Sequence, residues 1–394
     1  MELLKKFLDS RKKHFEKGGK LEKFHPIYEA NRTLFFIPGH TTKSGPHVRD
    51  GLDVKRFMTF VILALLPLFL FGVYNTGYYA NLASGESLAL FDVITRGMIV
   101  VMPLLVVSYG VGLAWEGLFA IVRGHNISEG FLVTGLIYPL ILPPTLPLWQ
   151  AAVGISFGVI IGKEIFGGSG RNLFNPALTA RAFLFFTYPV TMSGDKVWVA
   201  GKTATHAAVD VVSGATPLAV SMTTQSPETI TGALTKAGYS MNDLFFGFYP
   251  GCIGETSAFL CIIGGLFLCI TGIASYRIMI GGIIGVLAVA GLLNLFATPD
   301  SSPWMSLSPI HHLLMGGFAF GITFMATDPV SGPGIDEARW LYGFCIGGLT
   351  VMVRVFNPAY AEGTMLAILF MNLFAPLMDY IAIKIKLSKR IPNV

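Results

Sequence analysis

Apolar runs separated by short polar breaks occupy most of the chain from residue 57 onward. A membrane-spanning helix needs about 20 predominantly apolar residues. The pattern predicts about ten spans, at residues 57–75, 98–122, 129–142, 148–161, 176–188, 256–275, 278–296, 310–327, 340–356 and 364–383. The chain is 53% hydrophobic and 13% charged, whereas soluble chains average about 25% charged residues. We therefore expect an all-α polytopic membrane protein.

Prolines interrupt some of these runs. Pro139 lies inside the third predicted span, and Pro176 stands at the favoured first-turn position of the fifth. Proline inside a span frees backbone carbonyls, which a bilayer tolerates only where they line a cavity or meet protein. The sequence therefore predicts broken helices around an interior site.

Short motifs recur in the two halves of the chain. The first half contains Glu129-Gly130-Phe131, Pro139 and Asn175-Pro176-Ala177, and the second contains Gly316-Gly317-Phe318, Asp328-Pro329 and Asn357-Pro358-Ala359. Each half has five predicted spans, an odd number, so the second half is expected to be inverted relative to the first. Inverted repeats with broken helices place a binding site near the membrane midplane.

Basic residues cluster at both ends of the chain. Residues 1–56 hold 13 of the 28 Lys and Arg, and four more lie at Lys384, Lys386, Lys389 and Arg390. Clusters of this kind beside spans indicate cytoplasmic termini rather than a nucleic-acid surface. The predicted division is a cytoplasmic arm (1–56), a first five-helix repeat (57–188), an extracytoplasmic segment (189–250) and a second repeat with a basic terminus (251–394).

The long polar segment carries one motif with chemical content, Asp210-Val211-Val212-Ser213-Gly214-Ala215-Thr216. The small residues Gly214 and Ala215 leave the backbone unshielded, so a phosphate-bearing group could approach the Thr216 hydroxyl closely. On spacing alone a Ser/Gly turn explains the same residues.

Three carboxylates lie in or beside predicted spans: Glu116, in the run Gly112-Leu113-Ala114-Trp115-Glu116, Asp328 and Asp379. An ionisable side chain in a span costs about 2.5–3.5 kcal/mol on insertion scales, so each is a candidate functional residue. Carboxylate oxygens suit a hard cation. Alternatively, Asp328 caps a helix break and Asp379 lies in the wet interface near Lys384.

Two further stretches offer polar groups ahead of a helix. Asn172 and Asn175 supply donors and acceptors that suit a flavin, although helix capping also explains Asn175. Gly254, Glu255 and Thr256 follow the long polar segment and could fold against a ligand there, with a helix start as the plain alternative. No dinucleotide fingerprint or P-loop is present, so a nucleotide cofactor is expected on a partner.

The Asp-x-x-Ser-Gly-Ala-Thr motif resembles the flavinylation motif at which a flavin transferase attaches FMN to threonine. With the other motifs, nearly the whole chain resembles the family of B subunits of bacterial sodium-translocating NADH:quinone oxidoreductases. The resemblance implies FMN joined through its phosphate to Thr216, and non-covalent riboflavin at Asn172 and Asn175. It implies sodium uptake through acidic residues, and quinone binding along Gly112 to Glu116, with ubiquinone as the expected substrate.

The same resemblance implies partners and a location. The chain is expected to work in the inner membrane with other subunits, one of which binds NADH. Two alternatives remain open. One is the D subunit of the related ferredoxin:NAD oxidoreductase complex, whose members lack so long a basic arm. The other is a channel or secondary transporter for a small polar solute, which would need no flavin.

Overall fold

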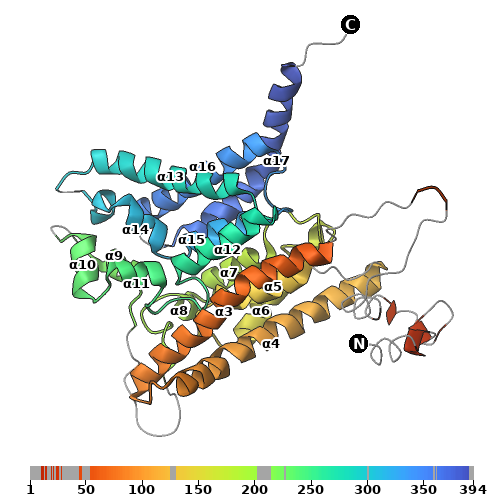
Figure 1. Cartoon of the computed structure of the whole chain (residues 1–394), viewed down its shortest axis with the longest axis horizontal. Coiled ribbons are helices and arrows are strands. Elements are labelled where there is room, and N and C mark those ends of the chain that lie inside the picture. Colours follow the sequence, from red (N-terminus) through yellow and green to blue (C-terminus); the bar gives the residue numbers. More distant parts are fainter. Residues whose placement is uncertain are drawn as a thin grey trace.

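The fold is that of a computed structural model in which membrane-length helices enclose shorter, broken ones (Figure 1). The structure describes scattered residues among the first 46, and then residues 54–124, 130–201, 214–225, 228–299, 301–357, 360 and 362–389. Most of the predicted arm, 1–56, lies outside these ranges, as do Pro358 and Ala359 of the predicted repeat motif. Within the described residues all regular elements are helical.

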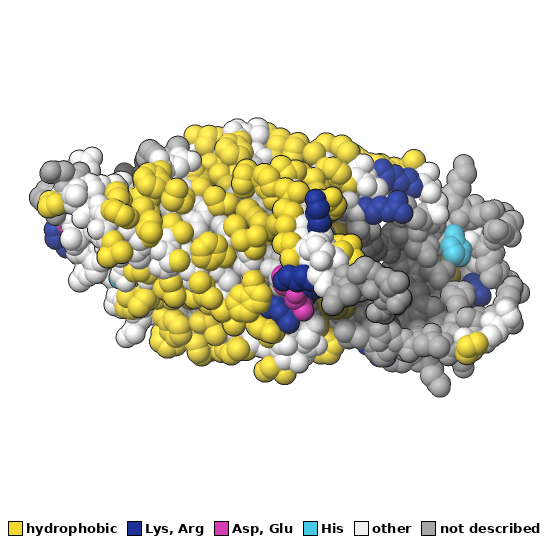
Figure 2. Space-filling model, turned by 90° about the horizontal axis from the view of Figure 1, so that it is seen from above, with side chains coloured by type: hydrophobic (Ala, Val, Ile, Leu, Met, Phe, Trp, Pro, Cys, Tyr) yellow, Lys and Arg dark blue, Asp and Glu magenta, His cyan; other side chains and the backbone are white. Residues whose placement is uncertain are grey.

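Among the described residues, six helices are long and apolar enough to cross a membrane. They correspond to α3 (Val54–Ser84), α4 (Leu90–Arg123), α6 (Leu148–Ile160) with the turn η2 (Glu164–Phe166), α13 (Tyr276–Leu295), α16 (Asp336–Phe356) and α17 (Thr364–Ser388). Their outward side chains are largely hydrophobic, and yellow covers most of the described part of the face in Figure 2. The chain is thus a multi-pass membrane protein.

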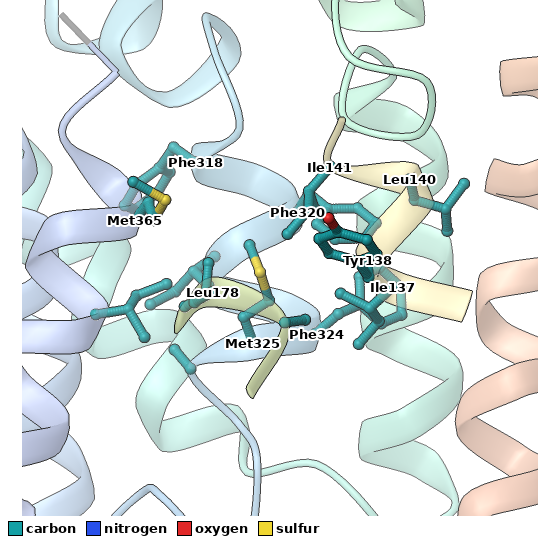
Figure 3. Close-up of a cluster of buried hydrophobic side chains, with 14 of the residues drawn as sticks. Ile137, Tyr138, Leu140, Ile141, Leu178, Phe318, Phe320, Phe324, Met325 and Met365 are labelled. Carbon is teal, nitrogen blue, oxygen red and sulfur yellow. The ribbon is translucent and has the colours of Figure 1, made fainter. Parts of the chain in front are cut away.

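The remaining apolar helices are short. They are α5 (Gly130–Leu140), α7 (Pro176–Thr187), α12 (Ala258–Ile270), α14 (Pro309–Leu314), α15 (Phe318–Phe320) and the π-helical turn η4 (Gly321–Met325). Side chains of α5, α7, α15 and η4 meet in the buried hydrophobic cluster of Figure 3. The core of the molecule is therefore built from broken helices.

The prediction of broken helices is confirmed at α5, whereas the break in the α14–α15–η4 segment lies inside a single predicted span. α5 ends at Leu140, after Pro139, and the following carbonyls are bonded across the molecule. Gly254 N–H donates to the Leu140 carbonyl at 2.7 Å, and Ile253 N–H donates to Leu142 at 3.2 Å. These bonds satisfy backbone groups that a proline-terminated helix leaves without a partner.

The predicted end of the first span at residue 75 and the predicted start of the second at residue 98 are wrong, because α3 continues to Ser84 and α4 already begins at Leu90. The apolar runs therefore predicted lengths for α3 and α4 that are too short. Polar side chains in this region are bonded instead of solvated: Asn75 donates to the Tyr249 carbonyl at 3.0 Å and Asn81 to the Ser87 carbonyl at 2.9 Å. All ten predicted segments contain helix, but six helices in the described part of the chain have membrane length.

A small lobe with its own core lies at one end of the molecule (Figure 1). It contains α9 (Pro217–Thr223), α10 (Ile230–Lys236) and α11 (Met241–Phe246), whereas the preceding short helix α8 (Pro189–Met192) packs Met192 into the main core. Its buried residues include Ile230, Leu234 and Leu244, packed with Trp304 and Leu307. The first turn of α3 and the last turn of α4 lie at the opposite end (Figure 1).

Candidate functional site

A cavity of about 620 Å³ lies among the broken helices at the end of the molecule where α3 begins. Small-molecule sites commonly occupy about 300–1,000 Å³, with a mainly apolar wall and a few convergent polar groups. This cavity follows that plan, and its wall includes Phe57, Lys163, Asn172, Asn175, Phe324 and Asp328. Tertiary structure thus brings both predicted flavin asparagines and one predicted cation ligand to a single space.

The two asparagines are held by their own backbone. The Asn175 Oδ1 atom accepts from Ala177 N–H at 3.0 Å and from Leu178 N–H at 3.3 Å, which confirms the capping interpretation for α7. The Asn172 Nδ2 atom donates to the Phe174 carbonyl at 3.0 Å. Since Asn175 uses its oxygen for the cap, its amide nitrogen is the group left to offer a ligand.

Asp328 follows η4 and also caps the chain locally. It accepts from the Ser331 hydroxyl at 2.7 Å and from Val330 N–H at 3.3 Å, as the helix-break interpretation predicts. These bonds fix the carboxylate at the cavity wall. A carboxylate has about four lone-pair sites, so two accepted bonds leave acceptor capacity for a cation.

Glu116 lies on α4 as predicted, and it is buried against a cation of the protein itself. Its Oε1 atom forms an ion pair with the Lys163 Nζ atom, and both residues are buried, with exposed fractions of 2% and 4%. A second pair lies beside it, in which Arg123 binds Glu164 at 3.0 Å. Positive and negative charges therefore alternate here, and each buried carboxylate has a partner.

Gly112, four residues before Glu116 on α4, allows Phe131 of α5 to pack against the helix backbone. A Cβ atom at position 112 would lie 1.9 Å from the Phe131 ring carbon Cζ. Real Cβ atoms do not come so close, so any side chain here would force the Phe131 ring to move.

Asp379 lies apart from the cavity, on α17. Its Oδ2 atom accepts from Gly334 N–H at 2.8 Å and its Oδ1 atom from Ile335 N–H at 3.0 Å. These are the orphan donors ahead of α16, so the carboxylate joins the two helices. Neither the predicted cation role nor the predicted wet-interface role accounts for these bonds.

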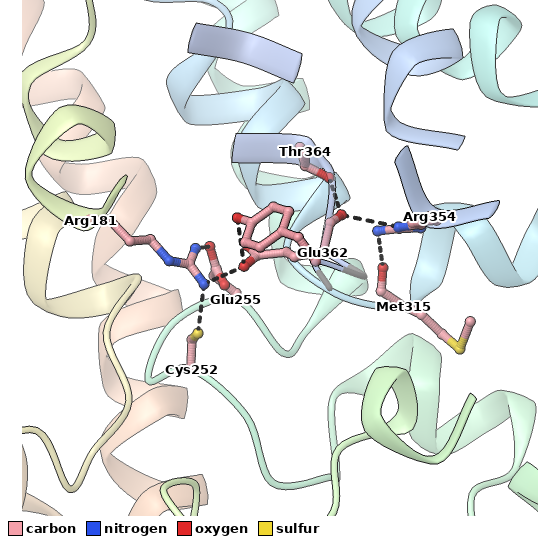
Figure 4. A network of polar contacts seen from close by, with 8 residues as sticks. Arg181, Cys252, Glu255, Met315, Arg354, Glu362 and Thr364 are labelled. Atoms are coloured by element: carbon pink, nitrogen blue, oxygen red, sulfur yellow. Dashed lines mark hydrogen bonds and ion pairs between the residues drawn. The ribbon is translucent and has the colours of Figure 1, made fainter. Parts of the chain in front are cut away.

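Arg181 of α7 forms the centre of a buried network (Figure 4). Its guanidinium binds Glu255 at 2.7 Å and Glu362 at 2.7 Å, and it contacts the Cys252 sulfur at 3.3 Å. The predicted site residue Glu255 is thus the partner of a buried arginine. Arg181 was not among the predicted site residues, although an arginine inside the predicted span 176–188 was a visible signal.

Arg354 of α16 is also fully buried, and it too was not among the predicted site residues although it lies inside the predicted span 340–356. It donates to the carbonyls of His312, of Met315 at 2.8 Å, and of Glu362 at 3.1 Å. Two of these carbonyls belong to the end of α14, where the chain breaks before α15. The guanidinium therefore replaces the helical hydrogen bonds that the break removes.

Thr216 begins α9 at the opposite end of the molecule from the cavity (Figure 1). Its half-buried hydroxyl accepts from Ala219 N–H at 3.1 Å, so it is the N-cap. The Tyr239 hydroxyl donates to the Ala215 carbonyl at 2.5 Å, and burial raises the pKa of Tyr239 to about 12, which keeps this donor protonated. Two bonds thus hold the segment in place.

Gly214 is packed closely against another part of the protein. This glycine is buried, and a Cβ atom there would lie 2.5 Å from the Val199 Cγ2 atom. Its missing side chain therefore makes room for Val199, and the approach of a phosphate-bearing group to Thr216 stays a prediction. Asp210 and Ser213 of the same motif lie outside the described residues.

Buried polar atoms remain without a hydrogen-bond partner among the described residues near this segment. They are Asn75 Oδ1, Tyr249 Oη and Thr256 Oγ1. Pro250, next to Tyr249, lies against Gly214, with 3.6 Å between its Cβ atom and the position of a Gly214 Cβ. A buried polar atom without a partner costs about 1–3 kcal/mol, so such a group commonly marks a ligand, ion or water.

Fold and site together define a multi-pass helical membrane protein with a separate lobe at one end and an interior cavity whose mainly apolar wall carries a few polar groups. A model of the NQR2, RnfD, RnfE family matches residues 41–387, and the chain belongs to that family. It is 46% identical to the B subunit of the Na(+)-translocating NADH-quinone reductase of Chromohalobacter salexigens, over 97% of this chain and 95% of the relative. It is 44% identical to the protein of the same name from Klebsiella pneumoniae, over 98% of both chains.

Replacing Arg181 by Gln should strongly destabilise the protein, because two carboxylates would then share a buried site without a cation. Breaking a buried ion pair costs about 3–5 kcal/mol. The stability of R181K should lie between that of the unchanged protein and that of R181Q, since an ammonium keeps the positive charge but cannot bind two carboxylates through a planar fork. The thermal unfolding midpoint in detergent measures the effect.

The matched control is R277Q, because Arg277 pairs with Asp336 at a partly exposed site at 3.1 Å. Pairs of this kind contribute about 0–1 kcal/mol. Equal thermal unfolding midpoints for R181Q and R277Q would show that the Arg181 network does not stabilise the fold.

Proposed function

We propose that this chain is the membrane-embedded B subunit of a bacterial Na⁺-translocating NADH:quinone reductase, which passes electrons through flavins to quinone while sodium leaves the cell. Its near full-length similarity to proteins of that name carries the proposal. Flavins supply the one- and two-electron chemistry, and the protein supplies binding, orientation and electrostatics. NADH binds on another subunit of the complex.

FMN is attached through its phosphate to the Thr216 hydroxyl by a flavin transferase. The hydroxyl is half-buried at the start of α9, where it is accessible to the transferase. The unpartnered atoms of Asn75, Tyr249 and Thr256 fit a ring system rich in donors and acceptors. Asp210, Ser213, Gly214 and Ala215 complete the motif that the transferase recognises.

Riboflavin occupies the cavity without a covalent bond. Its volume of about 620 Å³ is suitable for a ligand of this size, and Phe57 and Phe324 offer apolar contact. Asn172 and Asn175 orient the ring through their amides. The cap on α7 fixes the Asn175 rotamer before any ligand arrives, which lowers the entropic cost of binding.

Sodium and quinone use the end of the molecule that holds the cavity. Glu116 and Asp328 provide carboxylates to a dehydrated cation, and Asp379 keeps α16 and α17 in register around that route. Quinone binds along Gly112 to Glu116, where Phe131 packs against α4. The chain uses ubiquinone as the electron acceptor.

The topology proposed is ten crossings in two inverted five-helix halves, 57–188 and 251–394. The short helices α5, α7 and α12 and the α14–α15–η4 segment supply the four crossings beyond the six long ones. Both termini and the 1–56 arm are cytoplasmic in the inner membrane, and the 189–250 segment is outside. The lobe and the cavity lie at opposite ends, in agreement with this orientation.

Thr216→Val should remove covalent FMN, because no oxygen remains to form the phosphoester. Protein expressed with the transferase and run on a denaturing gel should lose its fluorescence under ultraviolet light. Thr223→Val at the other end of α9 is the matched control and should stay fluorescent. Persistent fluorescence of the Thr216→Val band would rule out this residue as the attachment site.

Asn175→Asp should lower the riboflavin content and leave the fold intact. The carboxylate keeps an acceptor for the α7 cap but loses the donor offered to the ligand. Riboflavin is extracted with acid and quantified by chromatography, with covalent FMN measured on the same sample. Normal riboflavin content in both N175D and N172A would place the flavin elsewhere.

Lys236→Cys tests the orientation, since Lys236 lies at the end of α10 with its side chain 78% exposed. The native cysteines are replaced first. An impermeant maleimide should label this thiol from outside intact cells. Labelling that requires lysis would invert the proposed topology.

A further inference from the structure

Lys163 belongs to two neighbouring environments at once. Its backbone follows α6, and its ammonium forms the buried ion pair with Glu116 of α4. Lys163 is also part of the wall of the 620 Å³ cavity, whereas Glu116 is not. The lysine is therefore a direct physical connection between the carboxylate on α4 and the space among the broken helices.

A buried ion pair gives little net stability, because the desolvation cost of two charges offsets their attraction. Here the pair lies next to a second one, Arg123 with Glu164, so the cluster is close to neutral as long as every member is charged. Removing the ammonium from Glu116 would leave a buried negative charge. Another monovalent cation could take the place of the ammonium beside Glu116 at low cost in free energy, because the total charge of the cluster is then unchanged.

We propose that Lys163 is a tethered cation that competes with sodium for Glu116, so that the contents of the cavity control the affinity of Glu116 for the transported ion. With Lys163 on Glu116, the carboxylate is occupied. When Lys163 turns into the cavity, Glu116 is available to sodium.

The cavity offers what the displaced ammonium requires. Asp328 lines the same space with acceptor capacity, and the amide oxygen of Asn172, on the same wall, is a second acceptor. The four-carbon stem of lysine lets its ammonium move between partners without a change of backbone. Negative charge on an occupant of the cavity would favour the inward position electrostatically.

Linkage makes this coupling reciprocal. If the inward position of Lys163 strengthens sodium binding, sodium at Glu116 must equally stabilise that inward position and whatever negative charge draws it there. Lys163 is thus a positioning residue, which acts on the cation through Glu116. The inference rests on the proposed function, because the charged occupant is the proposed flavin.

The test is a sodium titration of the purified complex at constant ionic strength, with N-methylglucamine as the replacing cation. Two readouts are followed: the sodium concentration at half-maximal quinone reduction, and the rise of the thermal unfolding midpoint with sodium, which reports binding without turnover. Riboflavin and FMN contents are measured on every sample.

K163Q removes the competitor, so sodium should act at roughly tenfold lower concentration in both readouts, a typical coupling between sites. K163R keeps a tethered cation and should resemble the unchanged chain. A merely structural lysine would give K163Q and K163R the same titration, and that result would overturn the proposal. A higher sodium requirement in K163Q would overturn it as well.

The double variant K163Q/E116Q covers the case in which K163Q does not assemble. Both charges are absent, so no buried carboxylate is left without a partner, and the sodium-dependent rise of the unfolding midpoint should vanish. Persistence of that rise would show that sodium binds elsewhere and would overturn the proposal. The riboflavin assay separates this proposal from the proposed function. If K163Q lowers the sodium requirement as expected but N172A and N175D keep normal riboflavin content, Lys163 acts as the tethered cation and the occupant of the cavity is not riboflavin.

Discussion

The arginine at position 181 joins the two halves of the chain, and the interior depends on it. It projects from α7 in the first half and binds carboxylates from two irregular segments of the second half, Glu255 and Glu362. A guanidinium withdrawn from water must have its donors satisfied, and its planar fork can serve two carboxylates at once. The segments at 251–257 and around 362 are thus held in place without regular secondary structure.

Irregular backbone at membrane depth follows from that constraint. A carbonyl without a partner costs several kcal/mol in hydrocarbon, so a helix can break only where protein groups replace its bonds. Arg354 replaces them at the end of α14, and the N–H groups of Ile253 and Gly254 do so beyond α5. The broken helices do not fill the interior as long ones would, and the cavity with Asn172, Asn175 and Asp328 lies among them.

Charge is arranged differently at the two ends of the protein. The cavity end holds the Glu116–Lys163 and Arg123–Glu164 pairs, in which each buried carboxylate faces a basic side chain. The lobe end presents Thr216 at the start of a short helix, where its hydroxyl caps α9 and no ion pair is formed. Buried ion pairs thus belong to the cavity end, and neutral capping groups to this part of the lobe.

Hydrophobic patterning alone was sufficient to predict a polytopic helical protein, because burying about 20 apolar residues in lipid depends on composition rather than on neighbours. It also located the break near Pro139, where proline acts on local backbone geometry, but it predicted residues 310–327 as one span and so missed the break after α14. It misjudged the lengths of α3 and α4, since a polar residue such as Asn81 is typical of a loop until its hydrogen-bond partner is known.

The candidate site also combines features that the sequence predicts with features that only the tertiary structure determines. The sequence identified Glu116, Asn172, Asn175 and Asp328 as individual residues, since an ionisable or amide group beside an apolar run is visible without a fold. Only tertiary structure decided which of them share a space and which are already paired. The partners of Glu116 and Glu255 are 47 and 74 residues away in sequence, and the spacing of residues along a chain carries no record of such contacts.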